Sequence, residues 1–332
     1  MQALLTKEIH FEAKRLHQKL SHLNYSLNDC LPFAPFTLEI NRLKKEKNAV
    51  ILAHNYQRAE IIFGVSDYHG DSLGLSKQAK ETDAKTIVFC GVHFMAQTAK
   101  ILSPKKKVLL PDPRAGCSLS ESIAAKDVIS LRKKHPRAGV VTYVNTSAEV
   151  KAESDVVCTS ANALKIIEAM PQQEIIFLPD IFMAQNLAKQ TSKKIIPWKG
   201  TCIVHETFTA EQIDNYRQAF PEIKVLAHAE CKPEVASKAD LVGGTSSMEH
   251  FVQNSAAKEF MLVTECGMSD LLQVQYPDKK FVVPCAICPH MKKINLENIL
   301  ASLQEEKYEI MIEETMRKKA LKAVERMFEL TA

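Results

Sequence analysis

The sequence has no long hydrophobic run and no excess of charge of one sign. No apolar stretch approaches the ~20 residues that a membrane-spanning helix needs, so no membrane association is expected. The first residues include Glu8, His10 and Glu12 among apolar ones, so the apolar core of a signal peptide is not expected either. The 43 basic and 39 acidic residues are interspersed and give a net charge of +4, which does not indicate nucleic-acid binding.

The cysteines do not suggest a disulfide framework. There are nine of them, an odd number, in a chain of 332 residues. A reducing cytoplasmic compartment is therefore expected, in which thiols remain available to metal ions. The hydrophobic content of 46% and the charged content of 25% are those of an ordinary globular protein. A chain of this length is expected to form two or three domains.

One pattern occurs three times: a basic pair, a short apolar run, a proline and then a cysteine. The copies end at Cys117, Cys202 and Cys288, which lie at nearly equal intervals. A constant period indicates one structural unit built three times. If the units pack around a pseudo-threefold axis, the three thiols meet there and form a metal site. A single such cysteine would be interpreted as a small buried residue after a strand. Three cysteines at the same position of a repeat favour the metal site instead.

The order of predicted elements is the same in each copy. Strands alternate with helices, and the predicted strands are 49–53, 86–89, 108–110, 139–143, 174–178, 195–196, 223–227, 260–263 and 281–283. This alternation predicts an α/β fold with parallel sheets and helices on both faces.

The predicted domains follow the repeat. Residues 1–35, with Leu4, Leu5 and Ile9 at helical spacing, are expected to form an N-terminal helical arm. The three units are residues 36–122 with Cys117, 123–207 with Cys202, and 208–304 with Cys288. A last helical segment within 305–332, from about Tyr308 to Leu330, is expected to pack on unit one.

Polar side chains follow the first strand of each copy and begin the helix after it. Those after the strand are His54, Asn145 and His228, and those at the helix start are Ser72, Ser160 and Thr245. In such sheets, ligands bind beyond the carboxyl ends of the strands. Each hydroxyl alone is explained by capping its helix, which is worth about 1 kcal/mol. Three helix N-termini beside three thiolates would instead form a pocket for a small polyanion.

Three thiolates without a fourth matching ligand leave one coordination position of a metal open. The pattern is compatible with zinc and with a 4Fe–4S cluster that has one iron free of protein ligands. Cys285 forms a C-x-x-C pair with Cys288, but only Cys288 keeps the register of the repeat. The other cysteines are interpreted as structural: Cys30, Cys90, Cys158, Cys231 and Cys266.

Seven segments carry a resemblance to one family. They are LAHNYQ (52–57), GDSL (70–73), FMAQTAKILSP (94–104), AGCSL (115–119), YVNTSAEVKA (143–152), WKGTCIVHE (198–206) and CPHMK (288–292). Together they resemble the quinolinate synthases, which act second in the bacterial de novo synthesis of NAD. The resemblance covers most of the chain.

The resemblance implies three homologous three-layer αβα sandwich units with short parallel sheets arranged about a pseudo-threefold axis. It implies a 4Fe–4S cluster on Cys117, Cys202 and Cys288, whose open iron acts as a Lewis acid. The implied reaction is a transferase-type condensation of iminoaspartate with dihydroxyacetone phosphate to quinolinate, with loss of phosphate and water. Iminoaspartate is unstable, which implies L-aspartate oxidase as a functional partner.

The resemblance also implies site residues. The implied substrate-binding residues are His54, Ser72, Tyr143, Val144, Asn145, Ser160, His205, His228, Ala229, Glu230 and Thr245. The implied catalytic residues are Glu230, Tyr143, His228 and Tyr56. The chain has Gln97, Ala229 and Gly244 where the family usually has Glu, Pro and Ser. At Gly244 one anion contact is expected to be absent or to be made by a backbone N–H instead.

Two other functions are open on the sequence alone. A metal-binding regulator or electron carrier would use the three thiolates for structure or redox sensing, but it would leave the three hydroxyls without a role. A zinc hydrolase would hold zinc in place of iron and sulfide. The sequence does not predict the oligomeric state.

Overall fold

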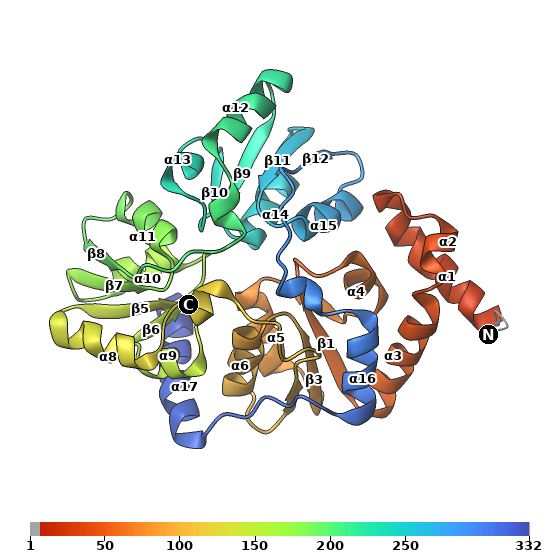
Figure 1. The fold of residues 1–332 in the computed structure, drawn as a ribbon, viewed down its shortest axis with the longest axis horizontal. Coiled ribbons are helices and arrows are strands. Elements are labelled where there is room, and N and C mark those ends of the chain that lie inside the picture. Colours follow the sequence, from red (N-terminus) through yellow and green to blue (C-terminus); the bar gives the residue numbers. More distant parts are fainter. Residues whose placement is uncertain (1–6, 332) are drawn as a thin grey trace.

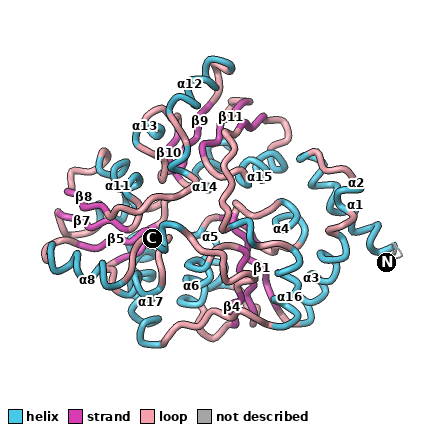
Figure 2. The backbone as a smooth tube through the Cα atoms, in the orientation of Figure 1, coloured by secondary structure: helices cyan, strands magenta, loops and turns pink. Residues whose placement is uncertain are grey.

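The structure contains three four-stranded sheets, each entirely parallel. It is a computed structural model that describes residues 7–331. Leu4 and Leu5 of the predicted arm lie outside the described residues, as does Ala332. The three sheets are grouped around a common centre, with helices packed beside each of them (Figure 1 and Figure 2). The predicted α/β fold of three αβα units is confirmed.

The first sheet has the order β2-β1-β3-β4. Its strands are β1 (Ala49–His54), β2 (Tyr68–Gly70), β3 (Thr86–Cys90) and β4 (Lys107–Leu109). Its helices are α3 (Ala34–Glu46), α4 (Ala59–Gly64), α5 (Ser72–Glu81) and α6 (His93–Leu102). In the central pair, Ala49 lies opposite Thr86 and Ala53 opposite Cys90. Residues 50–53 of β1 and residues 87–90 of β3 are apolar because helices cover both faces of the sheet.

The second and third sheets repeat this order as β6-β5-β7-β8 and β10-β9-β11-β12. α7 (Ser118–Glu121) ends the first unit. The second unit contains β5 (Gly139–Tyr143), β6 (Val156–Cys158), β7 (Glu174–Leu178), β8 (Lys194–Pro197), α8 (Ala125–Lys134), α9 (Ala148–Ala152), α10 (Ala163–Ala169), α11 (Ile181–Ala188) and η2 (His205–Thr207). The third unit contains α12 (Ala210–Ala219), β9 (Lys224–His228), α13 (Pro233–Ala236), β10 (Leu241–Gly243), α14 (Thr245–Asn254), β11 (Glu259–Val263), α15 (Gly267–Gln275), β12 (Lys280–Val282) and η3 (Met291–Lys293).

The nine predicted strands agree with the structure to within about two residues, but one strand in each unit was missed. The missed strands are β2, β6 and β10, which are three residues long and lie at the edge of their sheets. The first of them, Tyr68–Gly70, is largely exposed and has no apolar run. An edge strand of this length leaves almost no hydrophobic signal in a sequence.

The C-terminal segment differs from the single predicted helix. It forms α16 (Leu296–Glu305) and α17 (Glu314–Thr331), separated by an extended stretch. Within that stretch Tyr308 and Ile310 hydrogen-bond to β4, through Leu110 N to Tyr308 O (3.1 Å) and Ile310 N to Val108 O (2.8 Å). Alternating apolar residues suit this edge pairing better than a helix. α16 packs on α3 and β3, whereas α17 packs mainly on α9 and β6 of the second unit.

The described part of the N-terminal arm contains three helices. α1 (Lys7–Leu20), η1 (Ser21–Leu23) and α2 (Leu27–Cys30) precede α3, and α1 packs on α3 and α4. The buried Glu12 carboxylate accepts hydrogen bonds from Thr37 (2.6 Å) and Arg15 (2.7 Å), which satisfies its charge. Between residues 7 and 331, no helix combines the length and apolarity needed to cross a membrane.

Candidate active site

The first strand of each unit ends at the same central cavity. β1 ends at His54, β5 at Tyr143 and β9 at His228, and all three side chains line this cavity. The space not filled by atoms in and at the mouth of this cavity is ≈770 Å³, which includes space open to solvent. The predicted site residues in its wall are His54, Tyr56, Ser72, Tyr143, Val144, Asn145, Ser160, His205, His228, Glu230 and Thr245. A parallel sheet presents the residues after its strands at one edge, and three sheets around one centre bring three such edges together.

Cys117, Cys202 and Cys288 also line this cavity, so the repeat brings its three thiols to one place. Each follows the last strand of its unit, and the backbone of two of them is held by a carboxylate. Cys117 N donates to Glu121 (3.2 Å), and Cys288 N donates to Glu265 (3.1 Å).

Burial raises the pKa of all three thiols above the ordinary value. A buried thiolate therefore needs a cation to offset the cost of its charge. Three sulfur donors in one cavity are a donor set that suits a soft metal or an iron–sulfur cluster. The residues present thus fit the 4Fe–4S cluster that the resemblance implies.

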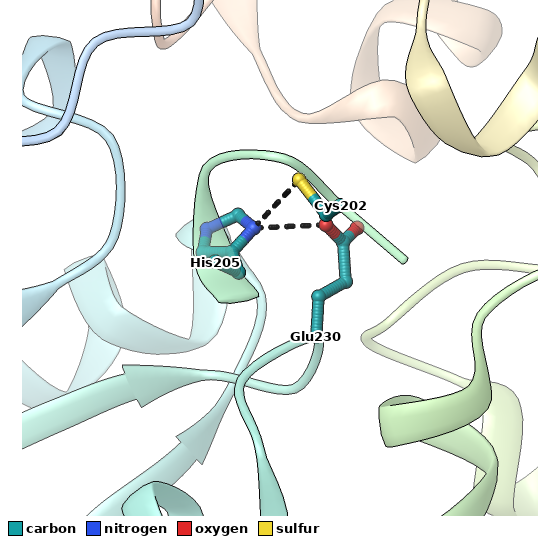
Figure 3. A group of neighbouring side chains, drawn as sticks. All are labelled: Cys202, His205 and Glu230. Atoms are coloured by element: carbon teal, nitrogen blue, oxygen red, sulfur yellow. Dashed lines mark hydrogen bonds and ion pairs between the residues drawn. The ribbon is translucent and has the colours of Figure 1, made fainter. Parts of the chain in front are cut away.

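A second group of possible ligands overlaps this one. Cys202, His205 and Glu230 each offer one ligand atom, and these atoms lie within 4.8 Å of one another (Figure 3). His205 Nδ1 lies 3.2 Å from Cys202 Sγ and 2.9 Å from Glu230 Oε2. His205 Nε2 lies 3.0 Å from the hydroxyl of Thr264. Both ring nitrogens of His205 therefore already have polar partners within the protein.

Glu230 lies at the centre of the polar groups in the cavity. Its Oε1 accepts hydrogen bonds from the hydroxyl of Tyr143 (2.7 Å) and from Asn145 Nδ2 (3.3 Å), and its Oε2 contacts His205. Burial opposes its ionisation, but His228, His205 and the hydrogen bonds outweigh that effect, so the pKa of Glu230 is lowered. Burial and the Glu230 charge raise the pKa of Tyr143 well above its ordinary value. The pair is thus a carboxylate and a protonated phenol.

His54 and His228 have the same local geometry in different units. The Nδ1 atom of each accepts the backbone N–H two residues later, from Tyr56 (3.2 Å) and from Glu230 (3.3 Å). An accepting Nδ1 carries no proton, so the proton of each neutral ring is on Nε2. Burial lowers the pKa of His54 to about 4 and of His228 to about 3, so both rings are neutral near pH 7. Each is a neutral N–H donor in the cavity wall.

None of the three predicted hydroxyls caps the helix that follows it. The cap of α5 is Asp71, which accepts from Gly74 N (2.7 Å), and the residues at the cap positions of α10 and α14 are Asn162 and Gly244. Ser72, Ser160 and Thr245 nevertheless line the cavity. Capping alone therefore does not explain these hydroxyls.

Gly244 lies against the side chain of Ser160. A Cβ atom at Gly244 would lie 2.2 Å from Ser160 Oγ, far inside contact distance. The absent side chain at position 244 thus leaves room for the Ser160 hydroxyl in the cavity wall. Thr245 Oγ1 also accepts a hydrogen bond from Asn55 Nδ2 (3.1 Å), which ties the first unit to the third.

Ala229 is the one predicted substrate-binding residue that is not in the cavity wall. Its backbone N–H donates to Gly243 O (3.0 Å) and its carbonyl accepts from Asn186 (3.0 Å). The small side chain is buried, and the backbone groups are used to hold the loop between His228 and Glu230.

Sequence reasoning missed two acidic residues and one lysine around the cavity. Asp71 and Glu265 line the wall. Glu265 follows the end of β11, so the rule that strand ends carry the site could have found it. Lys151 is fully buried and donates to the carbonyls of Val144 (2.8 Å) and Thr146. It therefore holds the loop that carries Asn145, and its α-helical sequence context gave no indication of this role.

Comparison with known proteins agrees with this geometry. Residues 38–329 match the family described as "Quinolinate synthetase A protein". The chain is 47% identical over 319 residues to a protein named quinolinate synthase from Sinorhizobium fredii, covering 94% of this chain and 89% of the relative. It is 52% identical over 288 residues to quinolinate synthase 1 of Mesorhizobium japonicum, covering 87% and 89%. It is 45% identical over 331 residues to the enzyme of that name from Caulobacter vibrioides, covering 98% and 90%. Because the family match covers residues 38–329 and the relatives are 45–52% identical along most of the chain, the chain belongs to the quinolinate synthase family, whose enzymes serve the biosynthesis of NAD.

Proposed function

We propose that this protein condenses iminoaspartate with dihydroxyacetone phosphate to form quinolinate, with loss of phosphate and water. The observation that carries the proposal is one cavity that combines three thiols, two neutral histidines, a carboxylate–phenol pair and three hydroxyls. Both proposed substrates are small anions, and the cavity offers N–H and O–H donors from all three units. The relatives are named quinolinate synthase, which supports quinolinate as the product.

We propose that Cys117, Cys202 and Cys288 hold a 4Fe–4S cluster. When bound, a cluster with three protein ligands would offer one iron as a Lewis acid toward a substrate carboxylate or hydroxyl.

The anionic groups of the substrates are proposed to bind at the donors in the cavity wall. The Nε2–H groups of His54 and His228 suit carboxylate oxygens, because both rings stay neutral and keep their donors near pH 7. Ser72 and Thr245 are the first residues of ten-residue helices. A helix N-terminus has free N–H groups and a positive dipole end, which favour a phosphate or carboxylate. Ser160 and Asn145 complete the polar wall.

Proton transfer is assigned to Glu230 and Tyr143. Glu230 is ionised and has a carboxylate oxygen free of a proton, whereas Tyr143 is protonated, so the first can accept a proton and the second can donate one. His205 orients Glu230 through their 2.9 Å contact. Tyr56 lies across the cavity, with its hydroxyl 2.7 Å from that of Thr264. The ring of Tyr56 packs edge-on against His54 and limits the space for substrate.

An oxidation of aspartate must supply the unstable imine. L-Aspartate oxidase is therefore the proposed functional partner, and rapid transfer of its product would limit hydrolysis.

The test uses two cysteines from one loop. Anaerobically purified wild-type protein should contain iron and sulfide and should form quinolinate from dihydroxyacetone phosphate and enzymatically generated iminoaspartate. Cys288→Ser should lose iron and activity, because it removes one proposed ligand. Cys285→Ser is the matched control, since Cys285 lies three residues away and outside the cavity wall, and it should keep both. Full iron in Cys288→Ser, or lost iron in Cys285→Ser, would refute the ligand set.

The group of Cys202, His205 and Glu230 supports a second candidate, a mononuclear zinc hydrolase. That site does not use Cys117. Zinc in the purified wild-type protein that persists in Cys117→Ser would favour this candidate, whereas iron that is lost in the variant would favour the cluster.

A further inference from the structure

Cys266 and Cys285 lie side by side at the edge of the third unit. Their sulfur atoms are 2.9 Å apart. Cys266 follows β11 and Cys285 follows β12, which are neighbouring strands of one sheet, so the segments after them run together. Cys266 N donates to Ala286 O (3.0 Å), which joins the two backbones beside the thiols. A disulfide requires an S–S distance of about 2.05 Å, so a sulfur movement of roughly 1 Å would complete the bond.

These two sulfurs do not belong to the central cavity. Cys288 lines the cavity wall, whereas Cys266 and Cys285 do not. Cys285 is exposed, and Cys266 and Cys288 are only partly accessible. The C-x-x-C spacing suggests that Cys285 pairs with Cys288, but the fold turns Cys285 toward Cys266. The sequence interpretation of Cys266 as purely structural therefore needs revision.

We propose that Cys266 and Cys285 form a reversible redox pair that closes to a disulfide and leaves Cys288 as a free thiol or metal ligand. The pair does not require the proposed function, because neither sulfur is part of the candidate active site. The oxidant is a low-molecular-weight disulfide such as oxidised glutathione.

The bond forms by two thiol–disulfide exchanges. The thiolate of Cys285 attacks one sulfur of oxidised glutathione, forms a mixed disulfide and releases one glutathione thiolate. The thiolate of Cys266 then attacks the Cys285 sulfur, forms the protein disulfide and releases the second glutathione. The two protein thiols lose two electrons and two protons, and both appear in two molecules of reduced glutathione. Cys285 reacts first because it is exposed to solvent, whereas burial raises the pKa of Cys266.

The bond would stabilise the loop that carries Cys288. Glu265 precedes Cys266 and already accepts a hydrogen bond from Cys288 N (3.1 Å) and an ion pair from Lys292 (3.1 Å). A covalent link from Cys266 to Cys285 would add a second connection between the start of α15 and this loop. The reduced pair leaves the connection to hydrogen bonds alone.

The experiment is peptide mapping of the full-length protein after anaerobic treatment with oxidised glutathione. Free thiols are alkylated at low pH before digestion with trypsin. Cleavage after lysine places Cys266 in peptide 259–279, and Cys285 with Cys288 in peptide 281–292. The expected product joins the two peptides through Cys266 and Cys285, with Cys288 alkylated, and reduced thioredoxin or dithiothreitol should separate them.

Cys266→Ser serves as the matched variant. Without the second thiol, Cys285 should stop at the mixed disulfide, and peptide 281–292 should gain the mass of one glutathione. A disulfide within peptide 281–292 of the wild-type protein would overturn the proposal, because it would make Cys288 the partner. Absence of any bond to Cys285 in oxidised wild-type protein would overturn it as well, and this measurement does not depend on how the variant folds.

Discussion

At the scale of single residues, the site depends on protonation states set by burial and neighbours. His54 and His228 are neutral donors because burial lowers their pKa. Glu230 is a carboxylate because its contacts with Tyr143, Asn145 and His205 offset the cost of burying its charge. None of these states follows from the residue types alone, since each depends on contacts with other units.

Glu230→Gln should keep the metal content and reduce quinolinate formation by about 100-fold or more, the range expected for loss of an acid–base group. The amide has nearly the shape of the carboxylate but cannot accept a proton from the substrate at neutral pH. Turnover and iron content would be measured on the same anaerobic preparation. Glu234→Gln, on the exposed start of α13 four residues away, should retain wild-type turnover. Wild-type activity in Glu230→Gln would remove this residue from the mechanism.

Lys151 is predicted to make stability depend on pH. Burial lowers its pKa from 10.5 to about 7 in the folded protein. Between these values the unfolded chain binds more protons than the folded chain, so the free energy of unfolding should rise with pH. Below about pH 7 the buried charge carries its full cost.

The measurement compares wild-type protein with Lys151→Met by urea unfolding from about pH 6.5 to about pH 9.5. The variant leaves the Val144 and Thr146 carbonyls without their donor, which costs about 1–3 kcal/mol. The free energy of unfolding of the wild-type protein minus that of Lys151→Met should increase as the pH rises across this range. A constant or decreasing difference would contradict a lowered pKa of Lys151.

At the scale of helices and strands, local sequence was a good guide wherever an element is apolar and central. The strand β1 was predicted from the run of residues 49–53, and residues 50–53 are buried in the structure. The edge strands β2, β6 and β10 were missed because their stability comes from pairing with a neighbour and not from an apolar run. The stretch around Ile310 was wrongly predicted as helix. It is extended because it pairs with the free edge of β4, and this pairing cannot be recognised in the local sequence.

Thr209→Ala should test how far the outer helices can vary without affecting the site. Thr209 Oγ1 accepts from Gln212 N (3.3 Å), and Gln212 Oε1 accepts from Thr209 N (2.9 Å), which forms a capping box for α12. Loss of this capping box in Thr209→Ala should lower the free energy of unfolding by about 1 kcal/mol. Quinolinate formation should not change, because α12 lies at the periphery (Figure 1). Thr209→Ser keeps the accepting oxygen and should remain close to wild type.

At the scale of the whole molecule, the three units are joined by hydrogen bonds around the cavity. Ser118 Oγ donates to Thr201 O (3.0 Å) between units one and two. Tyr143 donates to Glu230 between units two and three, and Asn55 donates to Thr245 between units one and three. The largest hydrophobic cluster also contains residues of all three units. The site therefore exists only when the units are docked.

Unfolding should accordingly be a single cooperative transition. The chain has one tryptophan, Trp198, which lies in the second unit and donates to Ser122 O (3.1 Å). Its fluorescence reports on that unit, whereas far-ultraviolet circular dichroism reports on helices of the whole chain. The two signals should change at the same urea concentration if the units unfold together. Separate midpoints would show that the second unit unfolds independently.

The sequence by itself determined the class of fold, the threefold repeat and the set of cysteines and polar residues that belong to it. These depend on the period of apolar residues along the chain and on spacing, which are properties of short segments. Only the tertiary structure decided which groups meet. Tyr143 and Glu230 are 87 residues apart, and Cys266 and Cys285 are 19 apart, yet each pair is in contact. Such contacts, and the pKa values that follow from them, depend on how whole sheets pack around the common centre, which no local pattern of residues specifies.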